Sequence, residues 1–128
     1  MRKARAASPE RTRFECPVYG FQEMINGKYK LRIIWALQDG PRRYGEIKKG
    51  LVRDISGSQE IAPRVLSREL KTLAAFGLIA RTDYQVVPPK VEYSLTPLGV
   101  SLLRILTPMV EWGRQHLVDD AALAPTEP

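Results

Sequence analysis

The chain has 128 residues, which is enough for one domain with a hydrophobic core. Its 44% hydrophobic and 27% charged residues argue against a disordered chain, and its single cysteine excludes a disulfide-stabilised scaffold. No apolar run approaches the roughly 20 residues of a membrane span, and no apolar segment follows the basic N-terminus, so we expect a cytoplasmic protein with no membrane partner. A net charge of +6 and a pI of about 9.7 slightly favour a polyanionic partner.

The first half of the chain predicts a basic arm followed by three helices. Residues 1–13 carry four arginines and one lysine without apolar periodicity, which is typical of a flexible arm. Helical spacing of apolar residues predicts a first helix that begins at Pro17 and ends just before Gly27, a suitable C′ residue. Residues 28–38 are apolar around most of the helix circumference, so this second helix is expected at the centre of the core. A short third helix is predicted over 44–51, and the polar segment 52–60 is expected to be a loop.

The next segment predicts one more helix and a β-hairpin. Pro63 suits the first position of a fourth helix over residues 63–76. Residues 78–85 and 90–95 alternate and are rich in β-forming side chains, which predicts two antiparallel strands. Pro88 and Pro89 fall between them, at the hairpin tip, where a missing N–H costs no ladder hydrogen bond.

The last helix is expected to begin at Thr96, with its hydroxyl as the N-cap, and to end near Val118. Residues 119–128 are interpreted as a disordered tail, so the folded domain is predicted to span residues 14–118. Helices followed by a two-stranded hairpin are typical of a winged helix-turn-helix. The predicted fold class is therefore mainly α with a small β-hairpin (α+β), with N-terminal and C-terminal helices available for dimerisation.

The fourth helix has two different faces. Leu66, Leu70 and Leu73 share one face and are predicted to enter the core. The opposite face is cationic with one hydroxyl, and Glu69 is interpreted as flanking it. Arginine pairs with guanine and serine bonds to base edges in a major groove wide enough for a helix, whereas the alternative is an ordinary solvated basic face. The candidate DNA-binding residues on this helix are Arg64, Ser67, Arg68 and Lys71.

Other cations are candidates for contacts to the DNA backbone. Arg42 and Arg43 precede the third helix, so they and its free N–H groups could meet a phosphate together. Lys90 adjoins the hairpin tip and is expected to reach the minor groove. Arg81 either contacts a phosphate or pairs with a nearby carboxylate.

The last helix carries more apolar residues than one small core needs. A helix that is apolar on two sides indicates burial against its own core and against a second copy in a two-fold dimer, the alternative being a large monomeric core. The residues predicted at this dimer interface are Leu102, Leu103, Leu106, Val110 and Trp112.

The single cysteine, Cys16, precedes Pro17 and is expected to be the N-cap of the first helix. There the helix dipole favours a thiolate, so Cys16 is a candidate redox sensor. The alternative is that Cys16 fills the core, because a free cysteine is often buried. His116 is the only histidine. The sequence therefore offers no catalytic residues, no metal ligand set and no cofactor motif, and predicts no enzymatic activity.

Several motifs in order carry a resemblance to a known family. They are "CPVYGFQEMINGKYKLRIIWAL", "DGPRRYGEIKKGL", "RVLSRELKTLAAFGLIART", "VPPKVEYSLTPLG" and "EWG". From about Cys16 to Gly113 the chain resembles the HxlR-type winged-helix regulators, which are relatives of the MarR group. The resemblance implies a homodimeric bacterial transcription regulator that binds double-stranded DNA at a pseudo-palindromic operator.

The resemblance also assigns positions. It places the recognition helix at residues 64–76 and the wing at 81–93, and it matches Cys16 to the cysteine that senses oxidants or electrophiles in several members. The chain departs from the family in the longer link before the recognition helix, where Ala62 replaces a capping serine. Alanine caps poorly, so Ser58 or Gln59 would be an alternative cap.

Two other functions remain compatible with the sequence. One is a winged-helix module that binds a protein rather than DNA. The cationic face of the fourth helix argues against this function. The other is a regulator with an inert Cys16 that senses a small molecule in a dimer-interface pocket. The aromatic residues that could line such a pocket are Tyr19, Phe21, Trp35 and Trp112.

Overall fold

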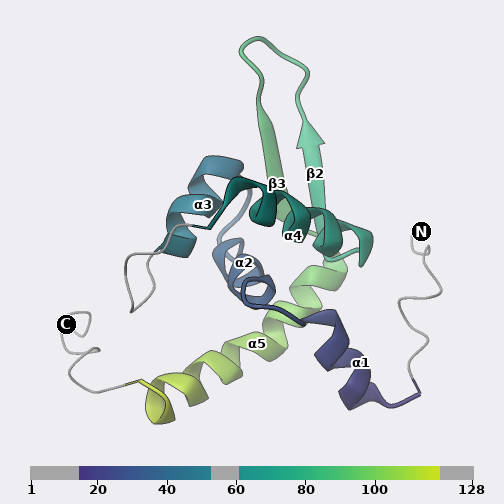
Figure 1. Cartoon of the computed structure of the whole chain (residues 1–128), viewed down its shortest axis with the longest axis vertical. Helices are drawn as coiled ribbons and strands as arrows, with labels where there is room; N and C mark the ends of the chain where they lie inside the picture. Colours follow the sequence, from purple (N-terminus) through teal and green to yellow (C-terminus); the bar gives the residue numbers. More distant parts are fainter. Residues whose placement is uncertain (1–14, 53–60, 119–128) are drawn as a thin grey trace.

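A computed structural model describes residues 15–52 and 61–118 of the chain. The described residues form five helices and three short strands (Figure 1). The five helices and two of the strands were predicted in this order, and one short strand was not. The elements are α1 (Pro17–Met24), α2 (Lys30–Ala36), β1 (Arg42–Arg43), α3 (Tyr44–Val52), α4 (Pro63–Ala75), β2 (Ile79–Asp83), β3 (Val91–Leu95) and α5 (Pro97–His116).

The core forms around α2, which Figure 1 shows between α4 on one side and α5 on the other. Ile33 and Ile34 on α2 are completely buried, as the apolar circumference of this helix predicts. The leucines of α4 that were predicted to face inward are buried as well, which confirms the orientation of that helix. The buried apolar residues are Ile33, Ile34, Leu37, Ile47, Leu51, Ile61, Leu66, Leu70, Leu73, Leu78, Ile79, Leu102 and Leu106.

The sheet has three antiparallel strands in the order β1-β3-β2. The hairpin of β2 and β3 is confirmed, with Pro88 and Pro89 in the connection between them. Strand β1 was not predicted, because two residues are too few to show alternation. It exists through pairing with β3, in which Arg42 lies opposite Tyr93 and Arg43 opposite Glu92.

The start of α5 is joined to the base of the hairpin by hydrogen bonds. The Thr96 side-chain oxygen accepts a hydrogen bond from the Gly99 N–H at 3.0 Å, which confirms Thr96 as the N-cap. The same hydroxyl donates to the Gly77 carbonyl at 2.6 Å, and the Thr96 N–H donates to the Leu78 carbonyl at 3.1 Å. The two ends of the wing and the first turn of α5 therefore form one bonded unit.

The first two helices are shorter than predicted. Helix α1 ends at Met24, and the chain then turns through Gly27, whose φ of +109° favours glycine. The predictions for the arm at 1–13, the tail at 119–128 and the alternative caps Ser58 and Gln59 lie outside the described residues. In the part of the chain that the structure describes, no helix is long and apolar enough to cross a membrane.

Candidate nucleic-acid interface

The outer face of α4 presents one row of polar side chains. Its members are spaced at i, i+3, i+4 and i+7, so they lie on the same side of the helix. All four are exposed, and the buried leucines hold the opposite side of the helix against the core. The row consists of Arg64, Ser67, Arg68 and Lys71, which are the recognition-helix residues predicted from the sequence.

The structure corrects the placement of Glu69, which does not flank this row. Glu69 is 6% exposed and points to the inner side of α4. Its Oε1 lies 2.6 Å from Nζ of Lys30 on α2, and the Lys30 ammonium also donates to the Asn26 carbonyl at 2.7 Å. The pair ties α4 to α2, and Glu69 therefore adds no carboxylate to the exposed side of α4 that carries the cations and Ser67.

A second contact fixes the beginning of α4 against α3. The Tyr44 hydroxyl, at the start of α3, donates to the Pro63 carbonyl at 2.9 Å. Ala62 is the N-cap of α4 and provides no side-chain hydrogen bond, as its replacement of a capping serine predicts. Pro63 has no N–H, and the Val65 N–H already donates to the Ala62 carbonyl at 2.9 Å. In the first turn of α4, at most the Arg64 N–H is therefore left to donate a hydrogen bond to a phosphate oxygen.

The two arginines of β1 face opposite sides of the sheet, because neighbouring strand residues alternate. Arg42 shares its side with Tyr93 and Arg81, is half-buried and donates to the Pro41 carbonyl at 3.2 Å. Arg43 is exposed on the other side and donates to the Pro89 carbonyl at 3.4 Å. Only Arg43 therefore turns toward the end of the wing.

The polar side chains of the wing contact one another. The Tyr84 hydroxyl donates to the Glu92 carboxylate at 2.8 Å, and this hydrogen bond, with the carboxylate charge, raises the pKa of Tyr84. The Lys90 ammonium lies 4.6 Å from the centre of the Tyr84 ring, an attractive cation–π arrangement. Arg81 is exposed, and no salt bridge joins it to another described residue.

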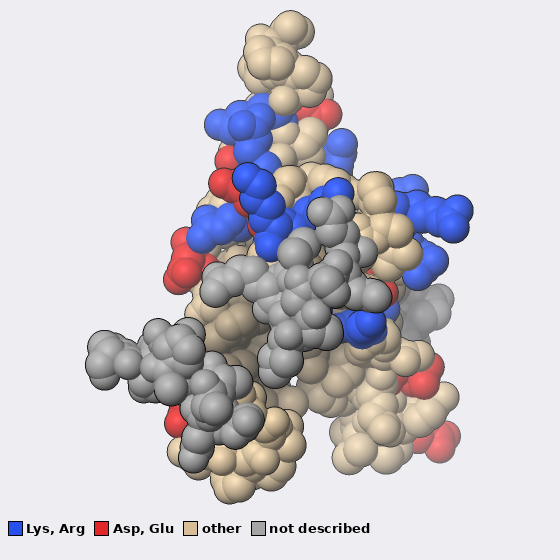
Figure 2. All heavy atoms as spheres, turned by 60° about the vertical axis from the view of Figure 1, so that its left-hand side comes forward, with Lys and Arg blue, Asp and Glu red and all other residues tan. Residues whose placement is uncertain are grey.

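Lysine and arginine gather on the half of the molecule that carries α3, α4 and the wing. In the face shown by Figure 2, they cover much of this upper half with fewer acidic residues among them. The lower half of the same view, formed around α1 and α5, is mainly neutral. Among the described residues in this view, lysines and arginines are therefore most frequent around α3, α4 and the base of the wing.

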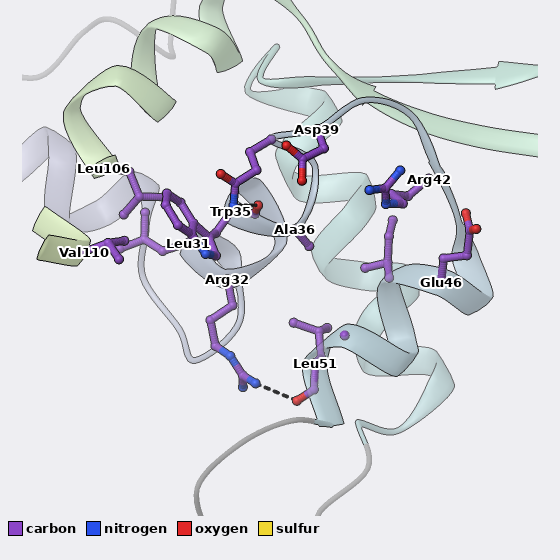
Figure 3. A pocket seen from close by; sticks show the side chains of 13 residues that line it. Leu31, Arg32, Trp35, Ala36, Asp39, Arg42, Glu46, Leu51, Leu106 and Val110 are labelled. Atoms are coloured by element: carbon purple, nitrogen blue, oxygen red, sulfur yellow. Dashed lines mark hydrogen bonds between the residues drawn. The ribbon is translucent and has the colours of Figure 1, made fainter. Parts of the chain in front are cut away.

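A cavity of about 600 Å³ lies between α2, α3 and α5 and was not predicted from the sequence. Its apolar side includes Trp35, Leu106 and Val110, and its polar side includes Arg42 and Asp39 (Figure 3). Below them the Arg32 guanidinium donates to the Leu51 carbonyl at 2.6 Å (Figure 3). These residues come from separate segments, so no local pattern in the sequence could reveal the cavity.

A smaller, mostly apolar cavity of about 310 Å³ lies between α1 and α5. Phe21 and Met24 line it from α1, and Leu98 and Ile105 from α5. The four aromatic residues considered as pocket lining do not meet in one place. Phe21 and Trp35 line different cavities, whereas Tyr19 and Trp112 are more than half exposed.

The predicted dimer residues separate into three environments. Leu102 and Leu106 belong to the core of their own chain, with only 5% of each exposed. Leu103 and Val110 are partly buried against that core, and Trp112 is 57% exposed and stacks on His116. An exposed apolar row runs beside them on α5, consisting of Leu98, Ile105, Met109 and Trp112.

Cys16 is the N-cap of α1, as the sequence predicts, and the structure shows that it is exposed. Its thiol makes no capping hydrogen bond, while its carbonyl accepts one from the Gly20 N–H at 2.9 Å. Exposure excludes the alternative that Cys16 fills the core of its own chain. Within residues 15–52 and 61–118, no cluster of His, Cys, Asp or Glu is suited to hold a metal ion.

Comparison with known proteins identifies the family. A family model described as an HxlR-like helix-turn-helix matches residues 24–121. The chain is 39% identical over 110 residues to YkvN of Bacillus subtilis (strain 168), an uncharacterised HTH-type transcriptional regulator, covering 86% of this chain and 87% of the relative.

Solved structures agree with this match. One neighbour, assigned to the MarR family of transcriptional regulators in Porphyromonas gingivalis W83, has a TM-score of 0.70 and 39% identity over 80% of this chain and 94% of its own. Another, the redox regulator HypR in its oxidised form, has a TM-score of 0.69 and 38% identity over 81% of this chain and 100% of its own. The fold, the family model and these relatives together show that the chain belongs to the HxlR-like helix-turn-helix family of transcriptional regulators.

Proposed function

We propose that the protein binds double-stranded DNA at a pseudo-palindromic operator, with α4 in the major groove and the wing beside it. The observation that carries this proposal is the exposed row of three cations and one serine on α4, opposite a fully buried leucine face. Arginine side chains in such a row suit guanine O6 and N7, while the exposed guanidinium of Arg43 suits a phosphate.

We further propose that two copies associate through α1 and α5. The support is the exposed apolar row on α5 together with Val18 and Tyr19 on α1, which are 70% and 53% exposed. The apolar cavity between the two helices continues this surface. A second copy related by a two-fold axis would cover the same surface on both chains and place two recognition helices about 34 Å apart.

Selection of bound fragments from the source genome is the experiment that tests DNA binding and dimerisation together. We expect recovered fragments to share an inverted repeat whose half-sites are separated by about one helical turn, roughly 34 Å. Binding should weaken steeply as salt rises, because phosphate contacts release counterions. Binding without a shared repeat would contradict the operator, and salt-insensitive binding to a protein partner instead of DNA would favour the protein-interaction alternative.

Replacing Arg68 with alanine is expected to weaken binding to the selected operator by about 1–3 kcal/mol and to relax its preference at one base pair. Arg68 is exposed in the middle of the α4 row, so the loss reflects a DNA contact rather than altered folding. The matched control is Arg104→Ala, which removes an exposed arginine from α5. Titration of labelled operator measures both, and equal affinity of the Arg68 variant and the wild type would remove this residue from the interface.

Two features support different regulatory inputs. The exposed thiol of Cys16 at the start of α1, beside the proposed dimer surface, supports redox control, and the similarity to the redox regulator HypR points the same way. The cavity of about 600 Å³ supports a small-molecule effector instead. Fragment selection with reduced protein, oxidised protein and the Cys16→Ser variant separates them, because only redox control requires the thiol.

A further inference from the structure

The tip of the wing carries an apolar group that the fold does not use. Val87 is 97% exposed and Val86 is 49% exposed, and Pro88 and Pro89 beside them are exposed as well. Figure 1 shows this end of the hairpin projecting away from the helices, and Figure 2 shows it as a neutral knob beyond the last charged side chains. These four residues, 86–89, are referred to as the apolar tip.

The charges of the wing do not explain how the wing would hold DNA. Arg81 and Lys90 are balanced by Asp83 and Glu92 within the hairpin, and Lys90 lies over the Tyr84 ring rather than at the end of the wing. The group that projects furthest is therefore apolar, and a contact made by this end would depend on shape and burial. Because the two prolines have a fixed φ, ordering the tip on binding costs little conformational entropy.

The proposed DNA binding is taken to include the wing in the minor groove beside the site of α4. On that basis, we propose that Val87 in the apolar tip wedges against a base step of this groove. The minor groove is only about 6 Å wide, so it must open to admit a β-branched side chain. Apolar side chains that enter this groove partly unstack a step and bend the duplex toward the major groove. Val87 would thus select sequence through deformability, without a hydrogen bond to any base.

This mode predicts a preference for flexible steps under the tip. A pyrimidine–purine step such as TA opens easily, whereas an A-tract is stiff and has a narrow minor groove. Wild-type protein is expected to bind an operator with TA at this position more tightly than the same operator with an A-tract. The preference should depend on Val87 and not on Lys90.

The test measures affinity and DNA bending, by energy transfer between dyes at the operator ends, for Val87→Ser. Loss of the burial of one valine is expected to weaken binding about tenfold, to reduce the bend and to abolish the TA preference. The salt dependence should stay unchanged because no charge is removed, whereas Lys90→Ala should lower its slope by about one. Val87→Leu, which keeps an apolar wedge, should retain the bend.

The control is Leu117→Ser, which makes an equivalent change at a 72% exposed leucine at the far end of α5 and should leave the bend unaltered. A Val87→Ser protein that binds and bends the operator as the wild type does would overturn the wedge while leaving the proposed DNA binding intact. A wild-type protein that binds no DNA would overturn both. Since Val87 is almost fully exposed, its replacement does not disturb the folded core.

Discussion

Replacing Lys30 with methionine is expected to lower the free energy of unfolding by about 3–5 kcal/mol. The variant leaves the Glu69 carboxylate, 6% exposed, without the ammonium that lies 2.6 Å away. An unpaired buried charge costs far more than the pair contributes, because it has lost its hydration and gained no partner. Urea unfolding at one fixed protein concentration measures the change, since association would otherwise shift the transition.

Two controls separate burial from simple pairing. The pair of Arg114 and Glu111 has a similar separation of 2.8 Å, but its side chains are 46% and 55% exposed. Arg114→Met is expected to cost less than about 1 kcal/mol, as exposed ion pairs do. The double variant Lys30→Met/Glu69→Leu should recover most of the stability, because apolar groups often replace a buried pair without loss. A Lys30→Met protein as stable as the Arg114 variant would contradict the role of burial.

Replacing Gly99 with alanine is expected to destabilise the protein by about 2 kcal/mol or more. A Cβ at this position would overlap the Leu78 carbonyl oxygen and lie 3.1 Å from Cδ2 of Leu95. The carbonyl belongs to the backbone and already accepts the hydrogen bond from Thr96, so it cannot move away without breaking the junction of α5 with the wing.

Gly113 in the same helix provides the comparison. A Cβ there would meet only Cδ1 of Leu117 at 3.7 Å, an ordinary contact. Gly113→Ala should therefore stabilise the helix by up to about 1 kcal/mol, the usual gain of alanine over glycine in a helix. Thermal unfolding of both variants should shift in opposite directions. A gain at both positions would show that the Leu78 contact relaxes readily.

Local signals in the sequence were sufficient for most elements of the fold. Thr96 followed by a proline, and leucines at helical spacing in α4, specify a cap and a buried face without reference to the rest of the chain. Strand β1 had no such signal, because its two residues become a strand only by pairing with β3, much later in the sequence. For the same reason, the sequence did not predict that the side chains of Arg42 and Arg43 lie on opposite sides of the sheet.

Glu69 shows how residue type can mislead where spacing does not. It lies three residues after Leu66 and four before Leu73, both of which face the core, so its position predicts an inward side chain. Its charge suggested the solvent side instead. The charge is accommodated only because Lys30, on another helix, supplies a partner. Such long-range compensation is a tertiary property that a single helix pattern does not contain.

The features of the candidate site also differ in whether a local sequence pattern or long-range packing determines them. The row on α4 is a property of one helix and was predicted in full, whereas the cavity near Trp35 and the exposed row on α5 depend on how separate elements pack. From the sequence, Leu102 and Leu106 could face either the core of their own chain or a second copy, because the helix is apolar on both sides. Only the position of α2 decides that these two residues face the core and that Ile105 and Met109 face outward.

The bonded junction of Thr96, Gly77 and Leu78 has a mechanical consequence. The wing is fastened to the first turn of α5, so the two elements turn together. In the proposed dimer, the angle at which two copies of α5 cross would therefore determine the distance between the two wing tips. Helix α5 has 20 residues and is about 30 Å long, so a small rotation at its middle becomes a much larger displacement at the tips.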